Sequence, residues 1–224
     1  MFSMKPKVNH MEFEHSLLDF KELERTEIDG VRHYITPVGT FKSVTTILGE
    51  KLDHSWLDIW KNRVGKVEVA KVSGIASRRG TAIHEICEKY LSNDPNYRNG
   101  AMPFNLDTFS KIKPMLDTNM GKIYGIESRL YSGLLKTAGT TDVIADYRGK
   151  LSIVDFKTSK RKKALEDIEG YMIQATAYAI MLEEMKGMAA KQIAILMAVD
   201  HDDPLEFIAD PNDWKDRVLE VFKT

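Results

Sequence analysis

Two neighbouring β-forming segments, joined by a tight turn, constrain the fold of this chain more than any other feature. Residues 137–147 and 151–157 cluster or alternate strand-forming side chains, and an Arg-Gly-Lys turn centred on Gly149 separates them. Such a turn makes the two strands antiparallel neighbours. Asp142 lies seven residues before Gly149 and Asp155 six residues after it, so we expect the two carboxylates to lie nearly opposite each other.

Two carboxylates that converge repel each other unless a divalent cation lies between them. The two-residue period of a strand places Lys157 on the same face as Asp155, where an ammonium group can orient a water or stabilise charge on a phosphate in the transition state. The plain alternative is an Asp–Lys pair on a strand surface. Apolar Ile153 and Val154 precede Asp155, which makes a simple exposed strand the weaker interpretation.

The segments before this hairpin predict one further hairpin and several helices. Asp29-Gly30 supplies a two-residue turn for a hairpin at residues 26–35. We expect helices at four places: after a cap at Ser43 or Thr46, from Ser55 with Trp56 and Trp60 on its apolar stripe, from Gly74 to about Leu91, and from Asp107 to a kink or end near Pro114.

The segments that follow complete a layered fold. We expect a strand at residues 123–134 before the central hairpin, then a long helix at 164–186 ended by Gly187, a buried strand at 193–199 and a helix at 213–222. This order predicts an α/β (α+β) fold, with a central mixed β-sheet flanked by helices. We expect residues 1–224 to form a single domain, with an N-terminal hairpin and helical region at 1–120 and a core of sheet and helices at 121–224.

Composition limits the partners and the compartment. The formal net charge is −1, whereas a protein that holds long duplex DNA by phosphate neutralisation alone is usually more basic. No run of eighteen apolar residues occurs, which argues against a membrane span. A single cysteine, Cys87, excludes an intramolecular disulfide. We therefore expect a cytoplasmic protein of a bacterium or of a phage-infected host.

One local patch is nevertheless strongly basic. Residues 157–163 read Lys-Thr-Ser-Lys-Arg-Lys-Lys, with five positive side chains among seven residues. A charge run of this kind is more often a solvated loop than a binding site. If the chain binds nucleic acid, the candidate contacts are Thr158, Ser159, Lys160, Arg161, Lys162 and Lys163.

The spacing of the acidic residues resembles a known family. Asp142, followed after twelve residues by Asp155-Phe156-Lys157-Thr158, resembles the PD-(D/E)XK nuclease superfamily in its RecB-like branch. The short Asp-x-Lys element is weak by itself, and four further features agree with it in the right order. They are Arg79-Gly80-Thr81-Ala82-Ile83-His84 with Glu88 one turn later, Glu127 on the preceding strand, the pair Gln174 and Tyr178, and Ser43–Leu48, a segment similar to one in phage exonucleases and the mitochondrial genome-maintenance exonuclease.

The resemblance implies a restriction-endonuclease-like core and a metal-dependent mechanism. It implies that Asp142, Asp155 and the carbonyl of Phe156 bind Mg²⁺ or Mn²⁺, and that Glu127 or His84 completes the shell or helps to hold a second ion. Lys157 would position and activate the attacking water. The remaining implied roles are orientation of water or phosphate by Gln174 and Tyr178, and contact with nucleic acid by Arg79 and the basic residues 158–163.

Each implied role has a plainer alternative. Seen alone, His84 on an apolar helix is more often a core histidine, and Glu127 can be a charge at a strand edge. Gln174 can be a buried amide and Tyr178 a core aromatic. Of the two glutamates near His84, only Glu88 stacks one turn away from it, so we expect Glu85 to be solvated and not to share the site.

The function predicted from these residues is a metal-dependent exonuclease that acts on DNA, with single strands favoured over duplex. Two enzyme alternatives stay open, a duplex-end exonuclease of the recombination type and a structure-selective endonuclease. A third alternative is a catalytically silent DNA-binding module that serves a helicase or recombinase partner. An enzyme acting on a small phosphorylated molecule would need a glycine-rich phosphate cradle, which the sequence lacks.

Overall fold

A small antiparallel sheet opens the described part of the chain. The computed structural model describes residues 12–52 and 61–223. Strands β1 (Glu24–Ile28), β2 (Val31–Thr36) and β3 (Gly39–Lys42) pair in that order. The predicted hairpin is confirmed, because Asp29 and Gly30 connect β1 to β2 with φ values of 52° and 76°. The third strand was not predicted.

Helices α1 (Val44–Lys51) and α3 (Lys66–Leu91) follow this sheet. The Ser43 hydroxyl accepts from the Thr46 N–H at 3.1 Å, which confirms the predicted cap. The helix predicted from Ser55, with Trp56 and Trp60, begins outside the described residues. The predicted boundary at Gly74 is wrong, because α3 continues through it for 26 residues in all. One glycine costs a helix about 1 kcal/mol, too little to end a helix whose C-terminal half packs on the sheet.

Helix α4 (Pro103–Asn119) also differs from its prediction. Pro103 occupies the first turn, where a missing N–H costs nothing, so the helix starts before the predicted cap at Asp107. It is not shortened at Pro114. Phe109, Ile112 and Leu116 are buried on its inner face, and this tertiary packing outweighs the lost hydrogen bond.

The central sheet has five strands in the order β4-β5-β6-β7-β8. Only β6 and β7 are parallel, so the predicted mixed sheet is confirmed. The edge strand β8 was not predicted, because its half-exposed residues give a weak pattern. The strand bounds are β4 (Met120–Ser132), β5 (Thr137–Tyr147), β6 (Lys150–Ser159), β7 (Gln192–Val199) and β8 (Leu205–Ala209).

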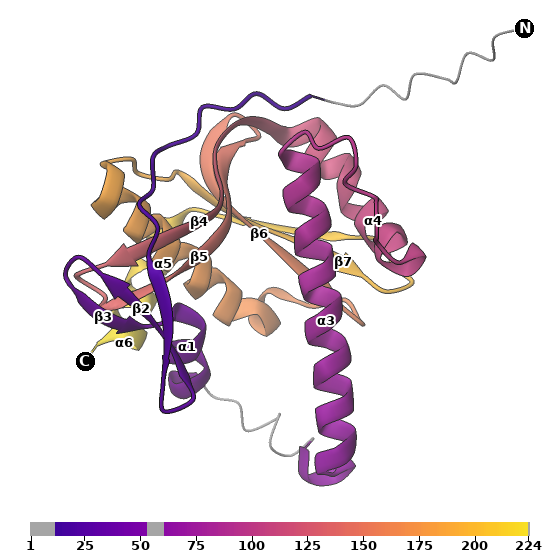
Figure 1. The fold of residues 1–224 in the computed structure, drawn as a ribbon, viewed down its shortest axis with the longest axis horizontal. Helices are drawn as coiled ribbons and strands as arrows, with labels where there is room; N and C mark the ends of the chain where they lie inside the picture. The colour runs from indigo at the N-terminus through magenta and orange to yellow at the C-terminus, as the bar shows by residue number, and fades with distance from the viewer. Residues whose placement is uncertain (1–11, 53–60, 224) are drawn as a thin grey trace, which may run out of the picture.

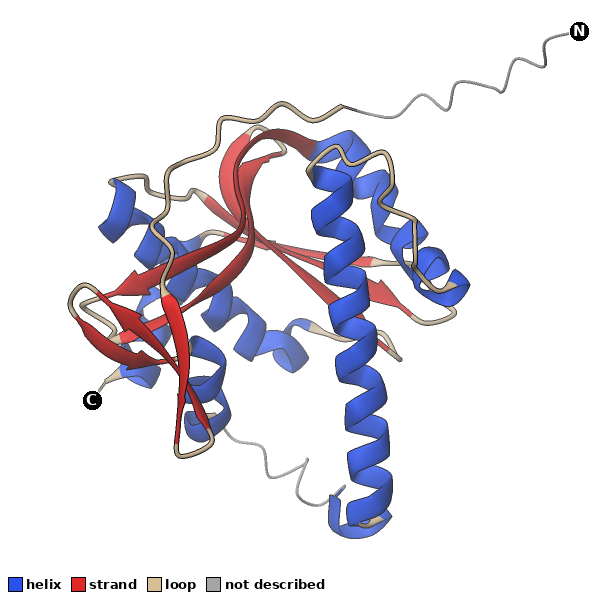
Figure 2. Ribbon diagram, viewed as in Figure 1, coloured by secondary structure: helices blue, strands red, loops and turns tan. Residues whose placement is uncertain are grey.

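Helices cover both faces of this sheet (Figures 1 and 2). Helices α3 and α4 form one core with one face, and α5 (Glu169–Lys186) and α6 (Lys215–Phe222) form a second core with the other. Short 3-10 turns, η1 (Leu165–Ile168) and η2 (Pro211–Trp214), precede α5 and α6, so both helices start later than predicted. Gly187 ends α5 in the left-handed conformation, as predicted.

The segment before β1 runs along the edge of β4. Ser16 and Leu18 donate their N–H groups to the carbonyls of Ile123 and Tyr124, each at 2.8 Å. In Figure 1 this segment passes β4 on the way to β1. Within residues 12–52 and 61–223, no helix combines the length and the apolar character that crossing a membrane requires.

Candidate active site

The β5–β6 hairpin brings the two predicted aspartates together. Val143 pairs with Val154, so the register continued by one residue places Asp142 opposite Asp155, as predicted. The β5–β6 ladder ends at the Val143–Val154 pair, so the two strands separate beyond it. The Asp142 side chain fills the gap, and its Oδ2 accepts the N–H of Phe156 at 2.7 Å. A carboxylate thus replaces the backbone partner of β6 at the point where the strands diverge.

His84 reaches this gap from helix α3. Its Nε2 lies 2.8 Å from the carbonyl oxygen of Phe156, and its Nδ1 lies 3.3 Å from Oδ1 of Asp142. The ring also stands edge-on to the Phe156 ring, with centroids 6.2 Å apart. A histidine that touches two of the predicted oxygen ligands is not an ordinary core histidine.

Glu127 joins the group from β4. Ile126 pairs with Val143 and Ser128 with Thr141, so Glu127 faces Asp142 across the β4–β5 ladder. Its φ of 48° lies in the left-handed region, which is uncommon for a non-glycine residue within a strand and is concentrated at functional sites. One ligand atom from each of His84, Glu127 and Asp142 lies within 4.8 Å of the others.

Asp155 and Lys157 form a buried ion pair beside this group. The side chain of Asp155 is 2% exposed and that of Lys157 is 17% exposed, and the Lys157 ammonium faces Oδ2 of Asp155. Oδ1 accepts from the Gln174 amide of α5 at 3.4 Å. The ammonium also lies 5.0 Å from the centre of the Tyr171 ring. Tyr171 was missed, although its place three residues before Gln174 on the same helix face could have indicated it.

Tyr178 packs between α5 and β5 next to the site and does not line it. Its side chain is buried, and it shares a hydrogen bond with Gln174 one turn earlier in α5. A Cβ atom placed on Gly139 would lie 2.7 Å from the Tyr178 hydroxyl. Gly139 therefore gives the tyrosine its space, a role that nothing in the sequence indicates.

The titration of the cluster is strongly perturbed. Burial disfavours the charged form of His84, but its contact with Asp142 outweighs burial and raises its pKa to about 9. Burial likewise opposes ionisation of Asp142, and His84 still holds the pKa of that carboxyl below its usual value. Loss of hydration, followed by repulsion from Asp142, raises the pKa of Glu127 to about 7. At neutral pH and without a metal ion, a charged imidazolium thus compensates the carboxylates.

Burial and neighbouring charges also shift the pKa values of the Asp155–Lys157 pair. Burial, only partly offset by Lys157, raises the pKa of Asp155 to about 6. Burial disfavours the charge of Lys157, yet Asp155 and then Asp142 outweigh it and raise the lysine pKa. Lys157 therefore keeps its proton at neutral pH, which suits a group that donates hydrogen bonds and stabilises negative charge.

A cavity of about 320 Å³ opens onto the cluster from α3 and β4. Glu85 and Glu88 both line it, so the prediction that the two cannot face one site is wrong, whereas the predicted solvation of Glu85 is confirmed by its exposure. Both side chains are exposed. The cavity is wide enough to contact residues on either side of His84 on the surface of α3. The full lining is Gly80, Thr81, His84, Glu85, Glu88 and Glu127.

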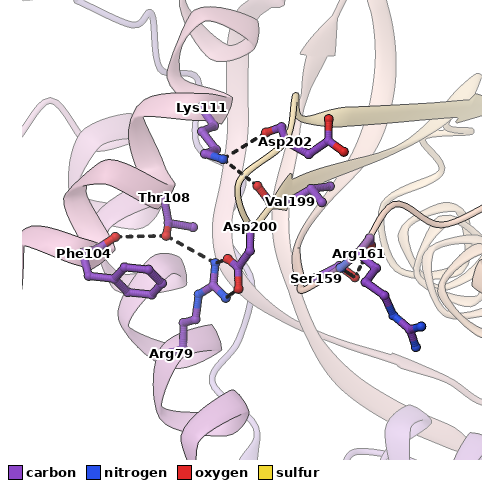
Figure 3. Close-up of polar contacts among 9 residues, drawn as sticks. All are labelled: Arg79, Phe104, Thr108, Lys111, Ser159, Arg161, Val199, Asp200 and Asp202. Atoms are coloured by element: carbon purple, nitrogen blue, oxygen red, sulfur yellow. Dashed lines mark hydrogen bonds and ion pairs between the residues drawn. The ribbon is translucent and has the colours of Figure 1, made fainter.

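The basic residues follow β6 outside this cavity. Lys160, Arg161 and Lys162 are exposed. The Lys162 ammonium lies 2.7 Å from the carboxylate of Asp202 in the loop after β7. Within the segment, the Ser159 hydroxyl donates to the carbonyl of Arg161 at 2.6 Å (Figure 3). Of the five positive charges predicted at residues 157–163, two are therefore paired with a carboxylate, Lys157 with Asp155 and Lys162 with Asp202.

Arg79 does not line the cavity. Its guanidinium makes a two-point ion pair with Asp200, with one contact at 2.7 Å (Figure 3). The structure thus brings His84, Glu127, Asp142, Asp155, Phe156 and Lys157 together with Gln174, and places Arg79 and the basic loop around them.

This arrangement offers a candidate site for a divalent metal ion beside a fixed ammonium. Carboxylate oxygens, a backbone carbonyl and one imidazole nitrogen converge on one small space, a donor set suited to Mg²⁺ or Mn²⁺. A charged lysine next to such a site can stabilise a developing anion. The geometry therefore fits metal-assisted hydrolysis of a phosphate ester.

Two curated proteins are similar to the chain. Mitochondrial genome maintenance exonuclease 1 of Mus musculus is 30% identical over 130 residues, covering 55% of this chain and 38% of that protein. The protein of the same name from Xenopus tropicalis is 26% identical over 170 residues, covering 70% and 49%. The chain thus spans less than half the length of either relative.

A solved structure and a family profile complete the comparison. A crystal structure from Eubacterium rectale, provisionally described as an exonuclease, is 13% identical with a TM-score of 0.47, covering 64% of this chain and 63% of that one. The profile of the PD-(D/E)XK nuclease superfamily matches residues 106–223, more than half of the sequence. That match contains Asp142, Asp155 and Lys157 in the geometry described above, and the chain therefore belongs to the PD-(D/E)XK nuclease superfamily.

Proposed function

We propose that the chain is a divalent-metal-dependent nuclease that hydrolyses phosphodiester bonds in DNA. The observation that carries this proposal is the convergence of His84, Glu127 and Asp142 within 4.8 Å of one another, next to the buried Asp155–Lys157 pair. Side chains from α3, β4, β5 and β6 meet at this point, and the cavity of about 320 Å³ gives it access to solvent.

The residues present fit a bound metal ion. Repulsion from Asp142 contributes to the raised pKa of Glu127, and a divalent cation would relieve that repulsion. The groups that would hold the ion are His84, Glu127, Asp142, Asp155 and the carbonyl of Phe156. When bound, Mg²⁺ or Mn²⁺ would lower the pKa of a water and neutralise charge on the scissile phosphate.

The other residues act by position. The neighbouring carboxylates raise the pKa of Lys157, so its ammonium would donate hydrogen bonds to the attacking water or to a phosphate oxygen. Gln174 holds Asp155 through its amide, and Tyr178 in turn holds Gln174. This chain of contacts from α5 fixes the carboxylate that lies next to the ammonium.

We further propose exonuclease action on single strands. The formal net charge of −1 favours gripping a free end over coating a duplex. The exposed Lys160 and Arg161 follow the end of β6, three and four residues beyond Lys157, and are placed to guide the strand backbone. Both curated relatives are called exonucleases, which agrees with this choice.

Digestion of end-labelled DNA tests the proposal. Linear single strands, circular single strands and linear duplex are incubated with Mg²⁺, Mn²⁺ or EDTA. We expect metal-dependent loss of linear single strands while circles survive, and no activity in Asp155→Ala or Lys157→Ala. Lys150→Ala is the matched control, because Lys150 is exposed at the other end of the same strand.

Each other outcome has a defined meaning. Cleaved circles indicate an endonuclease, and preferred attack on duplex ends indicates an enzyme of the recombination type. DNA binding without cleavage under either metal contradicts the catalytic proposal and favours a silent DNA-binding module.

A further inference from the structure

Arg79 contacts three side chains through the end of its guanidinium, although its Nε is buried without a hydrogen-bond partner among the described residues. Its guanidinium meets the Asp200 carboxylate with both terminal nitrogens, and the two side chains are only 11% and 16% exposed. One nitrogen also donates to the Thr108 hydroxyl at 3.3 Å, and the guanidinium carbon lies 4.9 Å from the centre of the Phe104 ring. Figure 3 shows this arrangement between α3, α4 and the loop after β7.

Asp200 is fixed from its other side as well. Its backbone N–H donates to the carbonyl of Ser159 at 2.9 Å, which joins the loop after β7 to the end of β6. The neighbouring carbonyls of Val199 and Asp202 accept from the Lys111 ammonium of α4, at 2.7 Å and 2.9 Å (Figure 3). Arg79 of α3 and Lys111 of α4 therefore both hold the loop that follows β7.

Helix α3 and strand β6 also meet at the cluster of His84, Glu127 and Asp142. His84 lies five residues after Arg79 on α3, about 7.5 Å further along the helix axis. It contacts the carbonyl of Phe156, three residues before Ser159 on β6. Helix α3 is thus attached to β6 at two points, once through His84 and once through Arg79, Asp200 and Ser159.

We propose that Arg79 and Asp200 are a positioning pair that fixes α3, and with it His84, relative to the end of β6. This inference rests on the proposed metal-dependent nuclease function. A displacement of about 1 Å at a reacting centre can lower a rate about a hundredfold, so a second fixed point on the helix matters for His84. Direct binding of a DNA phosphate by Arg79 would instead require its two-point contact to open and would leave Asp200 without its counter-charge.

Four variants separate the two roles. Arg79→Gln and Asp200→Asn each remove one charge of the pair, while Arg79→Lys keeps the charge but loses the two-point contact. Arg78→Gln is the matched control, because Arg78 is exposed on the same helix and its replacement changes the net charge equally. If Arg79→Gln does not fold, as judged by circular dichroism, Arg79→Lys carries the test.

Cleavage kinetics give the first readout. The positioning role predicts that Arg79→Gln and Asp200→Asn lower kcat about tenfold to a hundredfold. The KM for DNA and its salt dependence stay within about twofold of those of Arg78→Gln, because no phosphate contact is lost. An unchanged kcat with a raised KM and a salt slope shallower by about one would show a DNA contact and overturn the inference.

A second readout does not depend on cleavage. Mn²⁺ affinity without DNA is measured by electron paramagnetic resonance, and we expect it to fall in Arg79→Gln but not in Arg78→Gln. Amide hydrogen exchange at residues 80–91 should become faster only in Arg79→Gln. Equal affinities and equal exchange in the two variants overturn the inference. If the wild-type chain cuts no DNA, the proposed function fails, while this comparison still decides the positioning role.

Discussion

Replacement of Gly139 by alanine tests how tightly Tyr178 packs against β5 next to the site. Gly139 lies on β5, three residues before Asp142, and the Tyr178 side chain covers it. An added Cβ would lie 2.7 Å from the tyrosine hydroxyl oxygen, 2.9 Å from Cε1 and 3.2 Å from Cζ. Two of these contacts are shorter than real Cβ atoms adopt. The tyrosine is buried, so the clash cannot be relieved by turning it into solvent.

The expected change in stability follows from two opposing effects. Overpacking of a well-packed site costs about 1–3 kcal/mol. Replacing glycine also makes the unfolded chain less flexible, which stabilises the folded state by about 0.4–1 kcal/mol. We therefore expect Gly139→Ala to lower the free energy of unfolding by about 1–2 kcal/mol, which corresponds to a fall in Tm of about 2–8 °C for a chain of this size.

Urea unfolding and thermal melts measure this change. Gly49→Ala is the control, because no atom lies within 4 Å of its added Cβ in α1, and it should stabilise the protein by about 0.5–1 kcal/mol. Tyr178→Phe removes only the nearest contact, so the Gly139→Ala/Tyr178→Phe double variant should lose less than the sum of the single changes. A Gly139→Ala protein as stable as the wild type, or additive behaviour in the double variant, would refute the reasoning.

Three further predictions concern charge. Lys157→Met, which leaves a buried carboxylate unpaired, should abolish cleavage and lower the stability of the metal-free protein by about 3–5 kcal/mol in urea unfolding; unchanged stability would contradict the burial of the pair. The folded pKa values of Glu127 and His84, about 7 and about 9, lie above their ordinary values of 4.5 and 6.5. The folded state thus binds more protons, so Tm without metal should fall as pH rises from about 5 to 9, and a rising Tm would contradict these shifts. Lys162→Gln should change the salt dependence of DNA binding less than Lys160→Gln, because a loop aspartate already neutralises Lys162; equal changes in a binding titration would show that this ion pair opens.

The local pattern of the sequence was sufficient for the hairpin at the centre of the site. A two-residue period and a turn at Gly149 set which residues lie opposite each other, so the pairing of Asp142 with Asp155 and the shared face of Lys157 followed without tertiary information. The cap at Ser43 followed for the same reason, since capping acts between near neighbours. The mixed sheet followed from the order of strands and helices along the chain.

Helix boundaries depended on packing instead. Gly74 and Pro114 act as local breaks, yet burial of Phe109, Ile112 and Leu116 against the sheet keeps α4 intact through its proline. The edge strand β8 depends on pairing with β7, a long-range hydrogen-bonding partner that no local pattern encodes.

The sequence by itself determined the types of residue at the site and the register of the β5–β6 hairpin, because both follow from the order of residues along one local segment. Only the tertiary structure decided how side chains from different elements meet. It placed His84 between Asp142 and the Phe156 carbonyl, and it paired Arg79 with Asp200, 121 residues away along the chain. Such contacts depend on how α3 crosses the sheet, and that crossing is set by the burial of the whole helix face and not by any short motif.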